Sequence, residues 1–240
     1  MDSPSSLTIA ARFAGPPSSG NGGYTAGRLA TRVTGDGPVS VTLRTPPPLH
    51  TPLLVETAAG AARLLRGGEL VAEAASGDFS RPPAPPVDLE RALAVEPSYA
   101  GLVDHPFPTC FVCGPARTGG DGMRLTPGPS EPGRTACVWT PDASLSAVDD
   151  PTVAAGEFVW SALDCPGGWT SDLQSRPLVL GKMTASYDRR PRIGRPHVVV
   201  GALHASEGRK TFTSTALYEP GGDLLARAEQ VWIAVDPASF

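Results

Sequence analysis

The order of predicted secondary-structure elements in the second half of the chain limits the fold more than any other feature. One helical segment, Thr152–Trp169, is preceded by a strand and followed by four more. Partial apolar–polar alternation marks the strands, and Gly208 and the run Pro220–Gly222 supply turns between the last three. This order predicts an α+β fold with an antiparallel sheet. The strands are Arg134–Thr140, Leu178–Asp188, His197–Ser206, Lys210–Glu219 and Leu224–Val235.

The first half repeats this order. A strand-like segment at Leu7–Ala14 precedes a helix start at Gly20–Arg32, and further strands follow. The proline-rich run Arg81–Pro86 predicts a stiff connector, and Val87–Leu102 a short linking helix. We therefore predict two similar modules, residues 1–86 and 126–240, joined by a linker of residues 87–125. The strands of the first module are Val39–Thr45, Leu53–Ala59, Ala61–Arg66 and Leu70–Ala75.

Composition narrows the classes of partner. The 240 residues are 40% hydrophobic and 18% charged, which is typical of a globular core. The net charge of −4 comes without a long basic run, so we expect neither nucleic acid nor an anionic membrane as a partner. No apolar run approaches the length of a membrane span, and the first residues do not resemble a signal peptide. These features predict a cytoplasmic protein with free cysteines.

Asp164 is an acidic residue within an otherwise apolar helical segment. A carboxylate on the side of a helix that a sheet covers loses hydration, which is tolerated when it is hydrogen-bonded or when its reactivity is used. A bond to a neighbouring backbone group or to Thr170 would make it purely structural. Glu157 lies two helical turns earlier, on nearly the same face, and is a secondary catalytic candidate. As a solvated acid in the first turn, Glu157 also suits the helix dipole.

Two motifs resemble the hotdog-fold thioesterase-like superfamily. The segment Cys110–Pro115, continuing to Gly122–Leu125, is similar to the lead into the first strand of many acyl-CoA thioesterases. Glu157–Trp169 is similar to their central helix, with Asp164 where they place a catalytic acid. The resemblance implies a double hotdog: two curled antiparallel sheets, each wrapped around a central helix. Two such units pair to form the active unit, so the chain is expected to be a monomer or a homo-oligomer.

The chain departs from the family pattern before each helix. Val153–Gly156 replaces the histidine–glycine–glycine turn of small hotdog esterases, whereas Asn21, Gly22 and Gly23 of the first module are closer to it. By helix offset, Ala30 corresponds to Asp164. We therefore predict one site per chain, shared between the modules. Gly22, Gly23 and Gly156 would permit close approach of the substrate to helix-start amides, which favour a developing oxyanion.

Basic residues gather at strand ends. The resemblance implies that Arg189, Arg190, Arg209 and Lys210 bind the phosphates of coenzyme A or of an acyl-carrier protein, since arginine forks suit phosphate. The alternative is ordinary solvated loop charge, because proline and glycine alternate with these residues.

The cysteines could form a metal site or a redox pair, but the sequence does not favour either role. Cys110 and Cys113 have the spacing of a zinc-binding pair, with His105 nearby, but no second cysteine or histidine pair follows. We predict a buried turn with Gly114 and no metal or other cofactor. Cys165 lacks a histidine nearby in the sequence and is expected in the core.

The sequence favours an acyl-thioester hydrolase acting on acyl-CoA or acyl-carrier-protein substrates, with Asp164 as general base or nucleophile. A hotdog dehydratase or hydratase is a second possibility, which the absence of histidine from Thr152–Trp169 disfavours. A non-catalytic acyl-binding or scaffold protein is the third, and the replaced turn before the second helix supports it.

Overall fold

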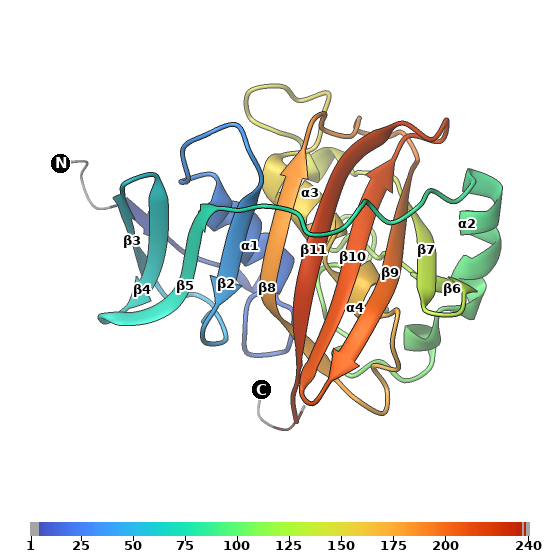
Figure 1. Ribbon diagram of the computed structural model, residues 1–240, viewed down its shortest axis with the longest axis horizontal. Helices are drawn as coiled ribbons and strands as arrows, with labels where there is room; N and C mark the ends of the chain where they lie inside the picture. Colours follow the sequence, from blue (N-terminus) through green and yellow to red (C-terminus); the bar gives the residue numbers. More distant parts are fainter. Residues whose placement is uncertain (1–4, 237, 239–240) are drawn as a thin grey trace.

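A single antiparallel sheet organises the molecule. The computed structural model describes residues 5–236 and residue 238. Eleven strands pair in the order β1-β3-β4-β5-β2-β8-β11-β10-β9-β7-β6, and Figure 1 shows α1, α3 and α4 together behind this sheet. The first-half strands are β1 (Ser5–Leu7), β2 (Val39–Leu43), β3 (Leu53–Ala58), β4 (Ala61–Arg66) and β5 (Glu69–Ser76). The others are β6 (Gly128–Glu131), β7 (Arg134–Trp139), β8 (Leu178–Tyr187), β9 (His197–Glu207), β10 (Lys210–Tyr218) and β11 (Leu224–Ala234).

The α+β class is confirmed, and the two predicted sheets are joined into one continuous sheet. Strand β2 of the first half pairs with β8 of the second, in a register that places Val39 opposite Ala185 and Thr42 opposite Lys182. Without this pairing both strands would present a row of unpaired backbone N–H and C=O groups. Joining them satisfies both edges and fixes how the two halves are placed relative to each other.

The helix predicted at Thr152–Trp169 is broken at its centre. It consists of α3 (Gly156–Ala162) and α4 (Cys165–Gly168), with Asp164 at the break. Pro166 explains the interruption, because it has no N–H to donate and its ring collides with the carbonyl four residues earlier. At the break, the carbonyl of Leu163 accepts hydrogen bonds from Thr215 Oγ1 and Gln230 Nε2 of the sheet, both at 2.7 Å. Polar side chains of the sheet therefore stabilise the break.

Two other predicted elements differ from the structure. The strand expected at Leu7–Ala14 is β1 followed by a 3-10 turn at Ala11–Phe13. The Gly15-Pro16 dipeptide that follows is a turn signal, so the apolar residues there are buried without forming a long strand. The linking helix is α2 (Leu89–Val95), shorter than Val87–Leu102 and followed by 3-10 turns.

Helix α1 (Gly22–Ala30) packs against α3 through glycines. Asn21 caps α1, its Oδ1 accepting from Tyr24 N–H at 2.9 Å, which accounts for where the helix begins. A Cβ on Gly23 would lie 2.6 Å from Asp164 Cβ, and one on Gly27 would lie 2.7 Å from Glu157 Cα. The contact residues on α3 have decreasing numbers as those on α1 increase, so the two helices run antiparallel. The start of α1 therefore lies beside Asp164.

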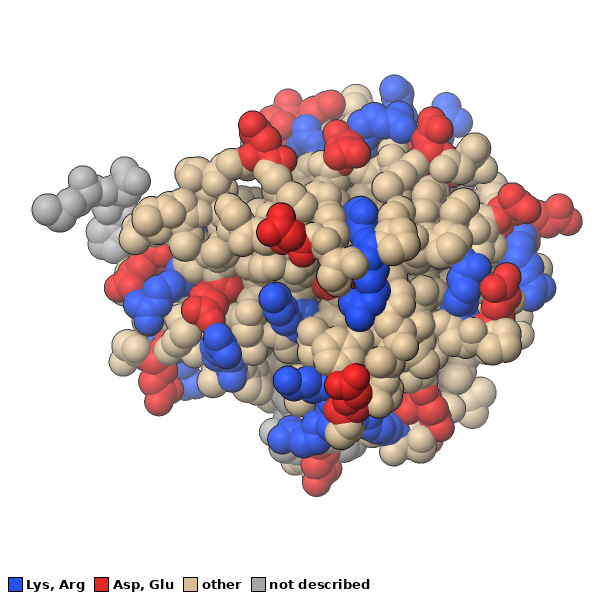
Figure 2. All heavy atoms as spheres, in the orientation of Figure 1, with Lys and Arg blue, Asp and Glu red and all other residues tan. Residues whose placement is uncertain are grey.

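The connector between the halves is part of the folded structure. Residues 77–88 cross the face of the sheet opposite to the helices, as Figure 1 shows. Glu229 on β11 accepts hydrogen bonds from the backbone N–H groups of Ser80 and Arg81, and Tyr218 donates to the Ala84 carbonyl. On this face, positive and negative side chains are interspersed (Figure 2). No helix among residues 5–236 has the length and apolar character needed to cross a bilayer.

His197 predicts how stability changes with pH. It is fully buried on β9, with Nε2 3.8 Å from Glu219 Oε2, and burial lowers its pKa in spite of the opposing effect of Glu219. The unfolded chain therefore binds more protons, and stability contributed by neutral His197 is present above about pH 6.5 and lost as the pH falls below it. The loss is about 1.4 kcal/mol for each unit by which the pKa is lowered.

Urea unfolding between pH 8 and pH 5, compared with His197→Gln, would measure this contribution. The difference in free energy of unfolding between wild type and variant should shrink toward acid pH. A difference that is constant over this range would contradict the prediction.

Candidate functional site

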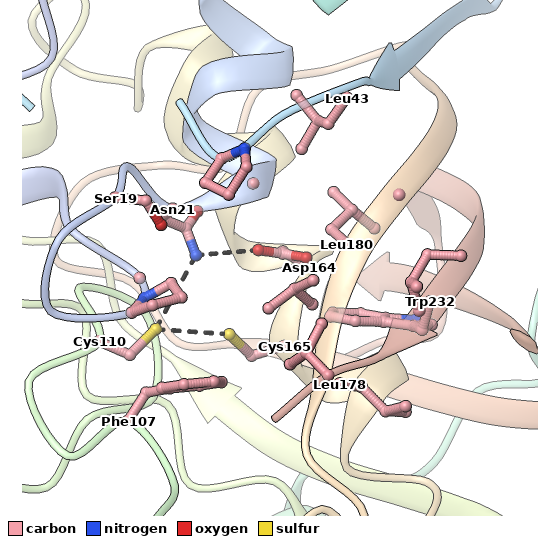
Figure 3. Close-up of a pocket in the computed structure, with 18 of the residues that line it drawn as sticks. Ser19, Asn21, Leu43, Phe107, Cys110, Asp164, Cys165, Leu178, Leu180 and Trp232 are labelled. Carbon is pink, nitrogen blue, oxygen red and sulfur yellow. Dashed lines mark hydrogen bonds between the residues drawn. The ribbon is translucent and has the colours of Figure 1, made fainter. Parts of the chain in front are cut away.

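A pocket of about 300 Å³ opens where the two halves of the chain meet, a volume at the lower end for small-molecule sites. The start of α1, the loop around Cys110, the α3–α4 break and the adjoining ends of β8 and β11 form its walls (Figure 3). Much of the wall is apolar, and the residues that contribute to this part include Leu43, Phe107, Leu178, Leu180 and Trp232.

Asp164 lies on this wall and is only 2% exposed. Its Oδ2 accepts hydrogen bonds from Asn21 Nδ2 at 2.9 Å and from the Gly23 N–H at 3.0 Å. Its Oδ1 is buried and has no hydrogen-bond partner among the described residues. Because α1 supplies both donors, the N-terminal end of that helix stabilises the carboxylate by direct bonds and by its dipole. Thr170 does not bond Asp164, since its hydroxyl donates to the Gly167 carbonyl.

Asn21 connects three parts of the site. Its Oδ1 caps α1, while its amide nitrogen donates to Asp164 Oδ2 and lies 3.8 Å from Cys110 Sγ (Figure 3). The side chain is almost fully buried and bonded at both ends, so it has one orientation. The corresponding cap position before α3 is Ala155, which has no such side chain, and Ala30 stands at the position that corresponds to Asp164. The paired polar groups therefore occur once per chain.

Burial changes the acidity of Asp164. Desolvation raises the pKa of Asp164 to about 7, although the Gly23 N–H and the Asn21 amide favour the charged form. A carboxyl group with a pKa near neutrality is suited to accept a proton from water and to return it. The arrangement can therefore support general acid–base chemistry beside an apolar surface.

The structure brings together four of the predicted site residues on the pocket wall: Asp164, Asn21, Gly22 and Arg209. Gly23 lies immediately behind Asp164 and donates to it. Arg209 bonds the Ala234 carbonyl through Nε and Nη2, at 3.2 and 3.1 Å. Because a guanidinium carries five N–H donors, Arg209 retains donors for an anion at the pocket.

Glu157 and Gly156 do not line the pocket. Glu157 and Asp164 both lie beside α1, at Gly27 and Gly23 respectively, but Glu157 is at the far end of α3 and only Asp164 reaches the pocket. A Cβ on Gly156 would lie 2.7 Å from the Tyr187 hydroxyl. Tyr187 is the last residue of β8, whereas the pocket is formed by residues near the first.

Arg189, Arg190 and Lys210 also lie outside the pocket walls. Arg189 and Arg190 follow the far end of β8, about 30 Å of extended strand from Leu178. Arg190 pairs with Asp149 at 2.8 Å and Arg189 with Asp223 at 3.6 Å. Lys210 begins β10 and is exposed. All of these residues lie at strand ends, but Arg189 and Arg190 are at the end of β8 that is far from the pocket.

A cluster of sulfur atoms adjoins Asp164, and the sequence did not predict it. The Sγ atoms of Cys110, Cys113 and Cys165 all lie within 4.8 Å of one another, and all three residues line the pocket. His105 Nε2 lies 3.2 Å from Cys113 Sγ. In the sequence, the Cys-x-x-Cys spacing is a signal for part of this cluster, but Cys165 is 52 residues further along, and only the fold brings it beside the other two.

Comparison with solved structures gives whole-chain similarity at low identity. A putative thioesterase from Novosphingobium aromaticivorans is 14% identical, with a TM-score of 0.64 over 96% of this chain and 95% of that one. A TesB protein from Mycobacterium avium subspecies paratuberculosis is 13% identical, with a TM-score of 0.58 over 90% and 87%. A conserved protein of unknown function with a hot dog fold, from Alicyclobacillus acidocaldarius, is 13% identical, with a TM-score of 0.57 over 98% and 96%.

The sequence matches no protein-family model and no curated protein. The structural likeness extends over nearly the whole chain, and the proteins concerned are thioesterase-like and hot dog proteins. The resemblance predicted from the sequence is thus confirmed at the level of the fold: the chain has a hot dog fold.

Proposed function

We propose that the chain hydrolyses acyl thioesters, of coenzyme A or of an acyl-carrier protein, in the pocket between its two halves. One observation carries the proposal: Asp164 is fixed on an apolar pocket wall by two donors from the opposite half, while its second oxygen is unbonded. A purely structural buried acid is expected to have both oxygens satisfied.

The halves correspond, in this proposal, to two hotdog units in one chain, residues 1–86 and 126–240. Continuity between β2 and β8 and the antiparallel contact of α1 with α3 support the double arrangement. Because Asn21 and Asp164 come from different halves, the site exists only when both are folded together.

The proposed reaction uses groups already in position. The acyl chain lies along the apolar wall, and Asp164 Oδ1 takes a proton from the water that attacks the thioester carbon. The C–S bond then breaks, the acid is released, and Asp164 returns the proton to the leaving thiolate. Of the amides at the start of α1, Gly23 donates to Asp164 and Tyr24 to the cap. The Gly22 amide, on the pocket wall, is then the candidate donor to the developing oxyanion. Arg209 is the candidate contact for the phosphates of the carrier.

A non-catalytic acyl-binding protein is the second candidate, and two observations favour it. Asp164 Oδ1 is buried as well as unbonded, so a water molecule must enter the wall before the reaction. The absence of a polar turn before α3 points the same way.

A panel of acyl-CoA substrates, from short to long chains, tests these alternatives. Release of free coenzyme A, followed with a thiol reagent, is expected above the rate without protein. Calorimetric titration with a non-hydrolysable thioether analogue measures binding separately. Tight analogue binding without thiol release from any thioester in the panel would reject the hydrolase and support the binding protein.

A further inference from the structure

Three of the four cysteines converge although they are far apart in sequence. Cys110 and Cys113 lie in the loop before β6, and Cys165 begins α4. Their three sulfur atoms lie within 4.8 Å of one another, and Cys110 Sγ is 3.8 Å from Cys165 Sγ (Figure 3). The fourth, Cys137, is buried in β7 and does not belong to this group. We call Cys110, Cys113 and Cys165 the thiol cluster.

The spacing within the thiol cluster suits a metal ion. Zinc bound tetrahedrally by thiolates at about 2.3 Å separates neighbouring sulfurs by about 3.8 Å. A disulfide would need about 2.05 Å. Soft sulfur donors select zinc over magnesium or calcium, which prefer oxygen ligands. The sequence offered no second pair of ligands, and the fold supplies one further ligand, Cys165, at the α3–α4 break.

The loop that carries two of the thiols is held in a fixed shape. The Gly114 N–H donates to the Cys110 carbonyl at 2.9 Å, and a Cβ on Gly114 would lie 2.5 Å from Cys110 N and O. The Phe111 N–H donates to Ala14 in the first half of the chain at 2.7 Å. Because the turn is closed and anchored, both thiols are held on one side before any ion binds.

Two N–H groups support the sulfur atoms. His105 Nδ1 accepts from the Phe107 N–H at 2.9 Å, so Nε2 carries the proton and donates toward Cys113 Sγ, 3.2 Å away. Asn21 Nδ2 lies 3.8 Å from Cys110 Sγ. Such N–H···S contacts stabilise thiolates that bind a metal. This tautomer makes His105 a positioning residue and leaves three protein ligands.

We infer that Cys110, Cys113 and Cys165 bind one zinc ion as thiolates, with His105 positioning Cys113. Each thiol loses its proton to solvent on binding, so three protons are released per ion. Three protein ligands with an open fourth position characterise zinc sites that accept water or a ligand. All three cysteines line the pocket, so the fourth position is reached from there. The thioester hydrolysis proposed above uses no metal, and the two proposals stand or fall separately.

Metal analysis of the full chain tests the inference. The protein is produced with added zinc, kept reduced with a phosphine and separated from free ions by gel filtration. Wild type and Cys137→Ala, the matched control, should each retain about one zinc per chain. Cys113→Ala and Cys165→Ala should retain less than about one fifth of that amount, because two thiolates bind far more weakly than three.

Cobalt substitution of the wild-type chain gives a result that does not depend on whether variants fold. Tetrahedral Co²⁺ should show visible ligand-field bands and near-ultraviolet charge-transfer bands of the intensity expected for three Co–S bonds. His105→Leu should leave these bands in place and weaken zinc about 10–100-fold, as loss of a supporting hydrogen bond does. His105→Gln, which keeps an N–H donor, should restore part of the affinity.

Three results would overturn the inference. One is wild-type protein without zinc and without cobalt–thiolate bands after reconstitution under reducing conditions. Another is equal zinc content in all cysteine variants. The third is a native disulfide within the thiol cluster, found by alkylation and mass spectrometry of protein that was never reduced. A cobalt spectrum changed by His105→Leu would assign that histidine as a ligand instead of a positioning residue.

Discussion

Asp164→Asn is expected to lower kcat for thioester hydrolysis by about 10²–10⁴-fold, the usual contribution of a general base. The amide oxygen of asparagine can still accept from Asn21 and Gly23, which bond only Oδ2 in the wild type. The fold should therefore persist, but no group remains at Oδ1 to take a proton from water. Steady-state thiol release, together with circular dichroism of the variant, provides the measurement.

Two carboxyl-to-amide changes serve as comparisons for Asp164→Asn. Asp36 is exposed in a loop, and Glu157 faces α1 outside the pocket. Asp36→Asn and Glu157→Gln should each change kcat less than about threefold, because surface and partly exposed changes of this kind perturb little. Undiminished turnover in folded Asp164→Asn would remove Asp164 from the proposed mechanism. A large loss of turnover in folded Glu157→Gln would contradict the exclusion of Glu157 from the site.

Gly27→Val should destabilise the chain by about 3 kcal/mol, through overpacking of the α1–α3 contact. The first atom of the new side chain would lie 2.7 Å from Glu157 Cα and 2.8 Å from Trp160 Cβ. Since the nearest atom belongs to the backbone of α3, the helices must separate. For a chain of this size the shift in Tm is about 6–12 °C downward. Urea and thermal unfolding measure the effect.

Gly221→Val is the matched control for Gly27→Val. Gly221 lies in the β10–β11 turn, where an added Cβ would meet nothing within 4 Å, and its φ is not in the left-handed region. Its unfolding free energy should change by less than about 0.5 kcal/mol. Equal stability losses in the two variants would show that the helix contact is not tight. Separation of α1 from α3 should also lower hydrolysis, because Asn21 and Gly23 move away from Asp164.

Strands β7 to β11 could be predicted nearly to the residue, because local patterns determine them, whereas β6 was not predicted. Alternation of side chains, with glycine at the turns, placed β9, β10 and β11 within one residue of the observed ends. The helix break was missed even though Pro166 was visible. The apolar pattern of helical period indicated a continuous helix in spite of Pro166. The hydrogen bonds from Thr215 and Gln230 that stabilise the break come from distant strands and cannot be read from the local sequence.

The position of the basic residues illustrates a different limit. Arg189 and Arg209 both lie near strand ends in sequence, but the turns of an antiparallel sheet lie at two opposite ends. Which of these ends adjoins the pocket depends on where the helices break and pack, not on any property of the arginines. Only Arg209 of the predicted cations lies on the pocket wall.

The sequence by itself determined the two-part order of helix and strands, the unusual carboxylate at Asp164 and the asymmetry between Asp164 and Ala30. These follow from periodicity, capping chemistry and residue type, all of which act locally. Tertiary structure alone decided that Asn21 bonds Asp164, 143 residues away, and that Cys165 meets Cys110 and Cys113. Those contacts depend on β2 pairing with β8 and on the glycines that let α1 approach α3, and such packing is a property of the whole chain.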